Sequence, residues 1–142
     1  DCRALEAAVL GHDNPKIAKL GEIINTSHSD YYDYQTKYFN PDGALVAIPA
    51  ALDEDQAKKI RRYTKKAYKA LGCSGLARID FFIDKKSGAI YINEINTLPG
   101  FTPISLYPKA WELSGVPIEK LVSQLCDLAI ERTKATSRLE IL

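Results

Sequence analysis

The chain has 142 residues, of which 46% are hydrophobic and 26% charged, as is ordinary for a globular domain. Its net charge of +1 gives no support for nucleic-acid or membrane-surface binding, and no apolar run approaches the ~20 residues of a membrane span. The three cysteines are odd in number and lack CxxC spacing, so we interpret them as free thiols in a reducing cytoplasm.

The first third of the chain is expected to form strands around a long loop. Residues 3–11 read as a strand that ends in the turn-forming residues 11–15, and residues 20–24 and 44–49 read as two more strands. Residues 25–43 between them are polar and aromatic, and loops of this length are often functional. We expect this loop to be mobile without nucleotide, because a lid must open to admit substrates.

A helix is expected to start at residues 53–55, whose acidic side chains suit a helix amino terminus, and to end at Gly72. Its buried stripe is predicted to hold Ala57, Ile60, Thr64, Ala67 and Leu71. The other face carries seven basic residues: Lys58, Lys59, Arg61, Arg62, Lys65, Lys66 and Lys69. A solvated face is favoured over nucleic-acid binding, because the chain is nearly neutral and no aromatic residues alternate with the cations.

Two strands, residues 78–83 and 91–96, are predicted to form a hairpin whose turn covers residues 84–88. Because side chains alternate along a strand, Arg78, Asp80 and Phe82 share one face. If Asp84 pairs near Ile90, three pairs lie opposite one another: Arg78 with Asn96, Asp80 with Glu94, and Phe82 with Ile92.

The pairing of Asp80 with Glu94 predicts a bound cation, because carboxylates directly opposite each other repel. Mg²⁺ usually takes one or two carboxylates together with substrate phosphates, and Asn96 adds a third oxygen donor on the same face. The strand then breaks at Pro99 and Gly100 into a turn whose backbone can approach a phosphate. The alternative is a solvated sheet face on which Asp80 pairs with Arg78 or a lysine.

The last third is expected to be helical. Residues 105–114 predict a short helix interrupted by Pro108, and a closing helix begins at Pro117. Its apolar face is predicted to contain Ile118, Leu121, Val122, Leu125, Leu128 and Ala129, and the tail after Arg132 is expected to be loosely held. This order of elements indicates an α+β fold, a mostly antiparallel sheet with helices packed against it.

Three stretches resemble D-alanine–D-alanine ligases, which have an ATP-grasp fold. Residues 75–84 followed by 91–102 resemble the carboxy-terminal signature of that family, and residues 31–38 resemble its mobile active-site loop. The third match is residues 8–11, which come before residues 21–23. The resemblance implies a carboxy-terminal fragment, residues 1–142, of the ATP-binding domain. The family's amino-terminal domain and first ATP-binding lobe are not recognisable in it.

The activity implied by the resemblance is ATP-dependent joining of two D-alanines through an acyl phosphate, for peptidoglycan precursor synthesis. The matching metal ligands are Asp80, Glu94 and Asn96, for two Mg²⁺ or Mn²⁺ ions. The matching catalytic groups are Arg78, the Gly100 N–H and Tyr38, and the second D-alanine would meet Ser105 and Leu106. The nucleotide would meet Lys37, Tyr31, Phe82, Asn93 and Glu94.

One position departs from the family pattern. Where family members commonly have a glutamate that bonds the ATP ribose, this chain has Ala4, and Glu6 follows on the same strand face. Either Glu6 substitutes for it, or the ribose contact is weakened, or this stretch differs from the family.

Several alternatives stay open. One is a ligase of the same family that joins D-alanine to D-serine or D-lactate, although Tyr38 favours an amine nucleophile. Another is a catalytically inactive fragment that binds metal and nucleotide, and a remote third is a metal-dependent nuclease using Asp80 and Glu94. The resemblance further implies that the complete enzyme is a homodimer, with neither nucleic acid nor membrane as a partner.

Overall fold

The computed structural model describes residues 1–24, 37–39 and 45–139. These residues confirm the α+β prediction: an antiparallel sheet carries helices on its faces. The strands are β1 (Cys2–Gly11), β2 (Lys16–Ile17), β3 (Gly21–Ile24), β4 (Lys37–Phe39), β5 (Leu45–Ala47), β6 (Gly75–Asp84) and β7 (Ile90–Asn96). The helices are α1 (Glu54–Ala70), α2 (Leu106–Leu113) and α3 (Ile118–Leu139). None of the described helices is both long and apolar enough to cross a membrane.

The strand order is β4-β5-β3-β1-β6-β7, and β2 pairs with the end of β1. The longest pairing is between β1 and β6, in register from Cys2 opposite Asp84 to Gly11 opposite Gly75. This register places Glu6 beside Asp80 and therefore joins the amino-terminal strand to the predicted hairpin.

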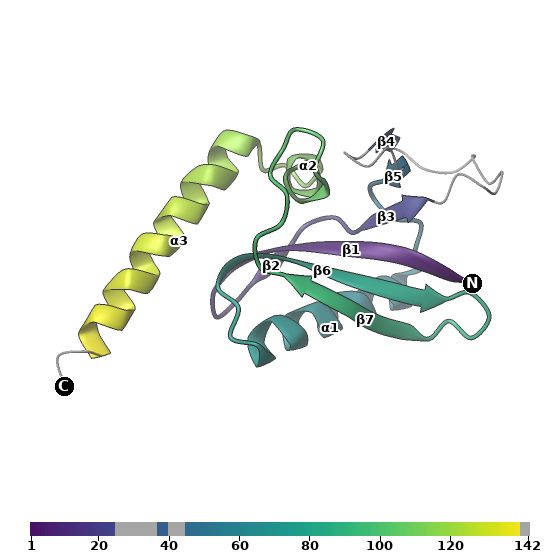
Figure 1. Ribbon diagram of the computed structural model, residues 1–142, viewed down its shortest axis with the longest axis horizontal. Coiled ribbons are helices and arrows are strands. Elements are labelled where there is room, and N and C mark those ends of the chain that lie inside the picture. Colours follow the sequence, from purple (N-terminus) through teal and green to yellow (C-terminus); the bar gives the residue numbers. More distant parts are fainter. Residues whose placement is uncertain (25–36, 40–44, 140–142) are drawn as a thin grey trace.

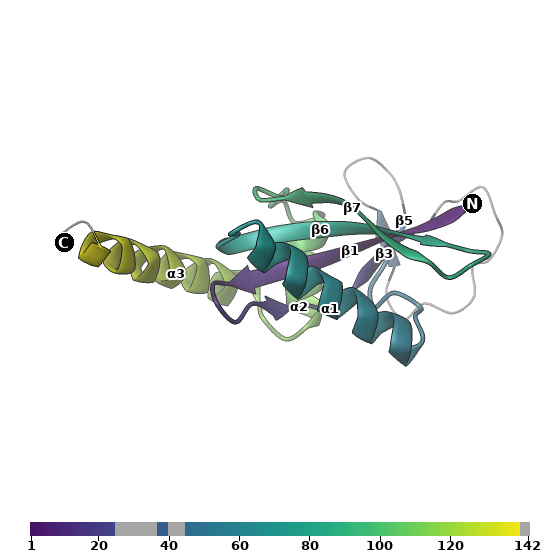
Figure 2. The same cartoon turned by 90° about the horizontal axis from the view of Figure 1, so that it is seen from below.

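The helices cover opposite faces of the sheet (Figures 1 and 2). Under α1 lies a core that contains Leu5, Val9, Ile79 and Phe81 from the sheet and Ile60 and Tyr68 from the helix. On the other face, Ala8, Leu10, Val46 and Ile48 pack with Leu106, Tyr107 and Trp111 of α2 and Leu121 of α3. Beyond this contact, α3 extends past the ends of β1 and β6 (Figures 1 and 2). Burial of these apolar side chains is the main stabilising contribution to such a fold.

The predicted helix corresponds to α1, and the Asp53 side chain caps it by accepting a hydrogen bond from the Gln56 N–H at 2.7 Å. Its fully buried positions are Ile60, Thr64 and Tyr68. The assignment of Leu71 to the buried stripe was wrong, because Leu71 is the C-cap residue and is 67% exposed. Tyr68, four residues after Thr64, takes the core position instead.

The predicted hairpin is confirmed, with one correction. Arg78 lies opposite Asn96 and Asp80 opposite Glu94, as expected. A β-bulge between Asp80 and Phe81 then shifts the register, so that Phe82 lies opposite Tyr91 rather than Ile92. The bulge leaves one extra residue on β7, which changes the pairing beyond that point by one position.

The expected interruption of residues 105–114 at Pro108 is not observed, and α2 is continuous. Pro108 lies in the first helical turn, where the N–H that proline lacks has no intrahelical partner in any case. The neighbouring Tyr107 hydroxyl donates to the Val9 carbonyl at 2.8 Å and ties α2 to β1.

The closing helix α3 buries Leu121 and partly buries Leu125 and Leu128. The other predicted members of its apolar face, Ile118, Val122 and Ala129, are exposed. The helix continues to Leu139, and residues 131–137 are exposed, so a loosely held tail stays a prediction.

Strand β4 lies inside the stretch that was predicted to be a loop, and it pairs with β5 from Lys37 opposite Ala47 to Phe39 opposite Leu45. That part of the loop prediction was wrong. The rest of the loop, including Tyr31, lies outside the described residues.

Candidate functional site

The candidate site is built on the three neighbouring strands β1, β6 and β7. Glu6, Arg78, Asp80 and Glu94 project from these strands on the sheet face that α2 covers farther along. The β1–β6 and β6–β7 registers bring these four side chains together, although they are up to 88 residues apart in the sequence.

Arg78 is at the centre of the cluster. Its Nε and Nη2 atoms donate to the two oxygens of Asp80 at 2.8 and 2.7 Å, a bidentate ion pair. Nε also lies 3.3 Å from Glu6 Oε2, and Nη2 lies 3.7 Å from Glu94 Oε1. The hydrogen bond to Asp80 raises the pKa of Arg78, so the guanidinium stays charged.

Glu6 is the buried member of the cluster, with 7% of its surface exposed. Burial raises its pKa to about 7; the Arg78 charge lowers it, and the charges of Asp80 and Glu94 raise it. Its Oε2 atom accepts no hydrogen bond from the described residues. A buried carboxyl group of this kind destabilises the fold when it ionises.

This burial predicts a pH-dependent stability difference between the wild-type chain and Glu6→Gln. Glu6 binds its proton more tightly in the folded state than in the unfolded state. This tighter binding contributes to the free energy of unfolding in full below pH 4.5, and the contribution is lost as the pH rises to about 7. At pH 8 the Gln variant should therefore be more stable, on the order of 3 kcal/mol in the free energy of unfolding, while near pH 4 the two should be equal. Urea titrations at both pH values test this, and a constant difference would contradict it.

The oxygen donors of the cluster suit a hard divalent cation. Three carboxylates surround one guanidinium, so the cluster carries an excess of negative charge when all three are ionised. Asn96, opposite Arg78, adds an amide oxygen. In the described part of the chain, however, no three His, Cys, Asp or Glu side chains are placed to hold a metal as they stand. Arg78 holds Asp80 instead, so a cation at Asp80 would compete with the guanidinium for the carboxylate, and the metal assignment stays a prediction.

The turn after β7 brings Gly100 against Ser105. The Ser105 Oγ accepts from the Thr102 N–H at 3.1 Å and lies 2.8 Å from the Thr102 hydroxyl. A Cβ at Gly100 would lie 2.9 Å from Ser105 Oγ, so a larger residue there would force the Ser105 side chain to shift. Leu106 follows as the first residue of α2, where backbone N–H groups lack intrahelical partners and attract anions.

The remaining predicted nucleotide contacts are scattered. Phe82 is 40% exposed on β6, where it lies opposite Ala4 and Tyr91, and Asn93 lies at the bulge on β7. The backbone of Lys37 and Tyr38 is in β4, at the far end of the strand order, and their side chains lie outside the described residues, as does all of Tyr31. These roles remain predictions.

Sequence reasoning missed the contact between Glu6 and Arg78. The sequence placed Glu6 on the same strand face as Ala4 and suggested only a nucleotide contact for it. In the structure Ala4 lies opposite Phe82, whereas Glu6 is buried opposite Asp80, the next pair on that face. The missing information was the β1–β6 register. Alternation alone would have shown that Glu6 and Arg78 could share a face once the two strands were known to pair.

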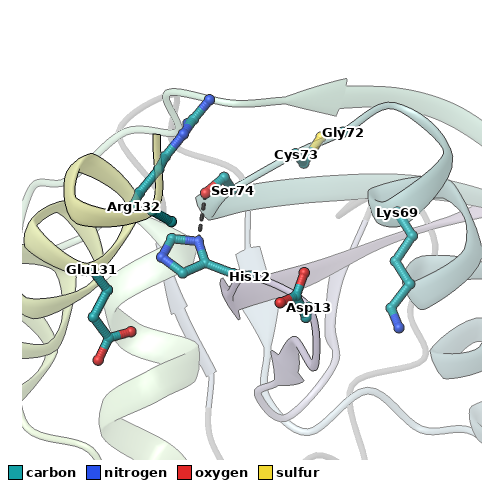
Figure 3. Close-up of a pocket in the computed structure, with 9 residues that line it drawn as sticks. His12, Asp13, Lys69, Gly72, Cys73, Ser74, Glu131 and Arg132 are labelled. Carbon is teal, nitrogen blue, oxygen red and sulfur yellow. Dashed lines mark hydrogen bonds between the residues drawn. The ribbon is translucent and has the colours of Figure 1, made fainter. Parts of the chain in front are cut away.

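A cavity with a volume of about 660 Å³ lies elsewhere among the described residues (Figure 3). It is lined by His12 and Asp13 after β1, by Lys69 and Ser74 near the end of α1, and by Arg132 of α3, among others. The His12 Nε2–H donates to the Leu128 carbonyl at 2.9 Å, and Ser74 Oγ lies against the other ring nitrogen, as Figure 3 shows. None of the predicted site residues lines this cavity, so it is not the candidate site.

Comparison with known proteins agrees with the resemblance read from the sequence. A family model described as D-ala D-ala ligase C-terminus matches residues 1–127. A D-alanine--D-alanine ligase of Ruminiclostridium cellulolyticum is 50% identical over 137 residues, which cover 96% of this chain and 36% of that protein. D-alanine--D-alanine ligase A of Escherichia coli K12 is 49% identical over 138 residues, 97% of this chain and 37% of its own length.

Solved structures give the same result. The D-alanine-D-alanine ligase of Coxiella burnetii matches with a TM-score of 0.80 at 39% identity, over 96% of this chain and 34% of that one. The VanG D-Ala:D-Ser ligase of Enterococcus faecalis matches with a TM-score of 0.69 at 36% identity, over 89% and 36%. A Bacillus anthracis D-alanine--D-alanine ligase complexed with ATP matches with a TM-score of 0.76 at 25% identity, over 94% and 41%. The chain thus spans little more than a third of the length of its relatives.

Proposed function

Because the chain belongs to the family of D-alanine–D-alanine ligase carboxy-terminal domains, we propose that it forms the metal- and phosphate-binding side of an ATP-dependent ligase. In the complete protein, this site would join two D-alanines to D-alanyl-D-alanine for peptidoglycan precursor synthesis in the cytoplasm. The observation that carries the proposal is the cluster of Arg78, Asp80 and Glu94, in which Arg78 lies opposite Asn96. The turn that holds Gly100 against Ser105 follows directly after Asn96 in the chain.

The reaction has two steps. A carboxylate oxygen of the first D-alanine attacks the γ-phosphorus of ATP, and ADP leaves, which gives an acyl phosphate. The amine of the second D-alanine then attacks the acyl carbon, loses a proton, and inorganic phosphate leaves. Both steps gain most from fixed positioning and from stabilisation of the charge that develops on oxygen.

The chain's own residues suit these demands. Asp80, Glu94 and Asn96 would hold two divalent cations, Mg²⁺ or Mn²⁺, which supply charge neutralisation for the phosphates when bound. Arg78 contacts Asp80 and Glu94 and lies opposite Asn96, so its planar donors would reach the transferring phosphate and the oxyanion. The Gly100 N–H would be a second oxyanion donor.

The second D-alanine is assigned to the start of α2. The Ser105 hydroxyl and the Leu106 N–H would hold its carboxylate, because a helix amino terminus favours negative charge. The nucleotide is assigned to Lys37, Tyr31, Phe82, Asn93 and Glu94, and Tyr38 to closure over the substrates. These contacts, and a homodimeric complete enzyme, are part of the proposal.

We expect the 142-residue chain alone to make no D-alanyl-D-alanine, whereas we expect the complete polypeptide to make it. The described residues offer one side of a site, so it stays open to water, which weakens each electrostatic contact. The test incubates each protein with ATP, Mg²⁺ and D-alanine and measures phosphate and dipeptide. Robust turnover by the chain alone would contradict the view that it is one side of a site.

A second candidate is a ligase that uses D-serine as the second substrate. It is supported by the match to the D-Ala:D-Ser ligase of Enterococcus faecalis at 36% identity. Competition between D-alanine and D-serine in the complete enzyme distinguishes the two, because the product formed in excess at equal concentrations identifies the substrate.

A further inference from the structure

We propose that Glu6 is a positioning residue that receives the Arg78 guanidinium when a divalent cation takes over Asp80 and Glu94. The inference rests on the proposed metal site. It concerns a residue that belongs neither to the metal ligands nor to the substrate contacts of the proposed function.

The first argument is that Arg78 and a cation compete for Asp80. Both Asp80 oxygens accept hydrogen bonds from Arg78, so a metal ion bound to Asp80 would lie next to the guanidinium and be repelled by its positive charge. Arginine remains protonated in proteins, so Arg78 cannot avoid the incoming charge by losing its proton. The repulsion therefore favours a shift of the guanidinium toward another anionic partner.

The second argument is that Glu6 is suited to be that partner. Its Oε2 atom lies 3.3 Å from Arg78 Nε and accepts no hydrogen bond from the described residues, so its acceptor capacity is free. A small movement of the guanidinium toward β1 would turn this contact into a charge-assisted hydrogen bond.

The third argument excludes the other carboxylates of the cluster. Asp80 and Glu94 are the groups that the cation itself would occupy, and the Glu94 side chain is 59% exposed. Glu6 is buried, and β1 holds it directly beside Asp80 along a continuous register. It is therefore the carboxylate of this cluster that can hold Arg78 after the exchange, near the position at which a transferred phosphate would meet it.

The test measures binding of Mn²⁺ alone to the 142-residue chain at pH 8, by electron paramagnetic resonance of the free ion, with no nucleotide or substrate present. Glu6→Gln should weaken Mn²⁺ binding about tenfold, because the displaced guanidinium loses a charged partner. The matched control is Glu22→Gln, which alters a buried glutamate that pairs with Arg3 on the opposite sheet face. That variant should bind Mn²⁺ like the wild type.

A double-mutant cycle separates positioning from a direct effect of the Glu6 charge. Arg78→Met keeps the apolar stem but removes the guanidinium, so in this background Glu6→Gln should change Mn²⁺ affinity less than twofold. An equal loss in both backgrounds would mean that Glu6 acts on the metal directly, and it would overturn the inference while leaving the metal site in place. If the wild-type chain shows no saturable Mn²⁺ binding, both the metal assignment and the inference are wrong.

A spectroscopic measurement provides a second route if the Arg78→Met variant does not fold. The Nε–H resonance of Arg78 should shift on saturation with Mg²⁺ in the wild-type chain, as its partner changes from Asp80 to Glu6. In Glu6→Gln the resonance should broaden, because the guanidinium has no ionised partner to hold it. Identical Mg²⁺-induced spectra in the two proteins would contradict the exchange, whatever the ligase assay shows.

Discussion

Phe81→Ala should reduce the free energy of unfolding by about 3–5 kcal/mol, whereas Phe82→Ala should cost less than about 1 kcal/mol. The two residues are adjacent on β6 and chemically identical, but they point to opposite faces of the sheet. Phe81 is 1% exposed and packs in the core beneath α1, whereas Phe82 is 40% exposed on the candidate-site face. The difference between the variants therefore measures burial alone.

The measurement is a urea titration of the 142-residue chain and its two variants, followed by circular dichroism. Since domains are stable by only about 5–15 kcal/mol, Phe81→Ala should lower the midpoint sharply or leave the chain partly unfolded in water. Similar losses for the two substitutions would mean that β6 does not present its faces as described. If Phe82 contacts nucleotide as proposed, its variant should weaken nucleotide binding in the complete enzyme while the stability changes little.

Alternation and turn residues were enough to predict the hairpin and its central pairs. The positions of Arg78, Asp80, Glu94 and Asn96 follow from a period of two and from one turn. The β-bulge could not be predicted, because nothing in residues 90–96 marks the extra residue. The displaced pairing of Phe82 with Tyr91 is its consequence.

The part of the site that escaped prediction depends on contacts between distant segments. Glu6 contacts Arg78 only because β1 pairs with β6. No local sequence pattern predicts which strands of a sheet are neighbours. Leu71 was assigned wrongly for a local reason, since its helical spacing fitted the buried stripe although the helix had already ended at Ala70. Local periodicity predicts which face a residue occupies, whereas its partners are set by tertiary packing.

Glu94→Gln should lower the rate of D-alanyl-D-alanine formation by the complete enzyme by about 10³-fold or more, because it removes a charge that the metal ions would bridge. Glutamine keeps the size of the side chain, and Glu94 is largely exposed on β7, so the fold should be unaffected. The Asp80–Arg78 pair should also survive, since Glu94 contributes only a 3.7 Å contact to that guanidinium.

The matched control is Glu112→Gln on α2, an exposed glutamate that pairs with Lys109 at 2.8 Å and lies outside the cluster. It makes the same chemical change without altering the proposed metal ligands, so turnover should stay within about twofold of the wild type, as for most surface substitutions. The assay measures dipeptide and phosphate at saturating ATP and Mg²⁺, and Mn²⁺ binding is measured in parallel. Loss of both metal binding and turnover in Glu94→Gln would place Glu94 in the metal site. Wild-type turnover in that variant would remove Glu94 from the mechanism, and the cluster around Arg78 would then have only a structural role.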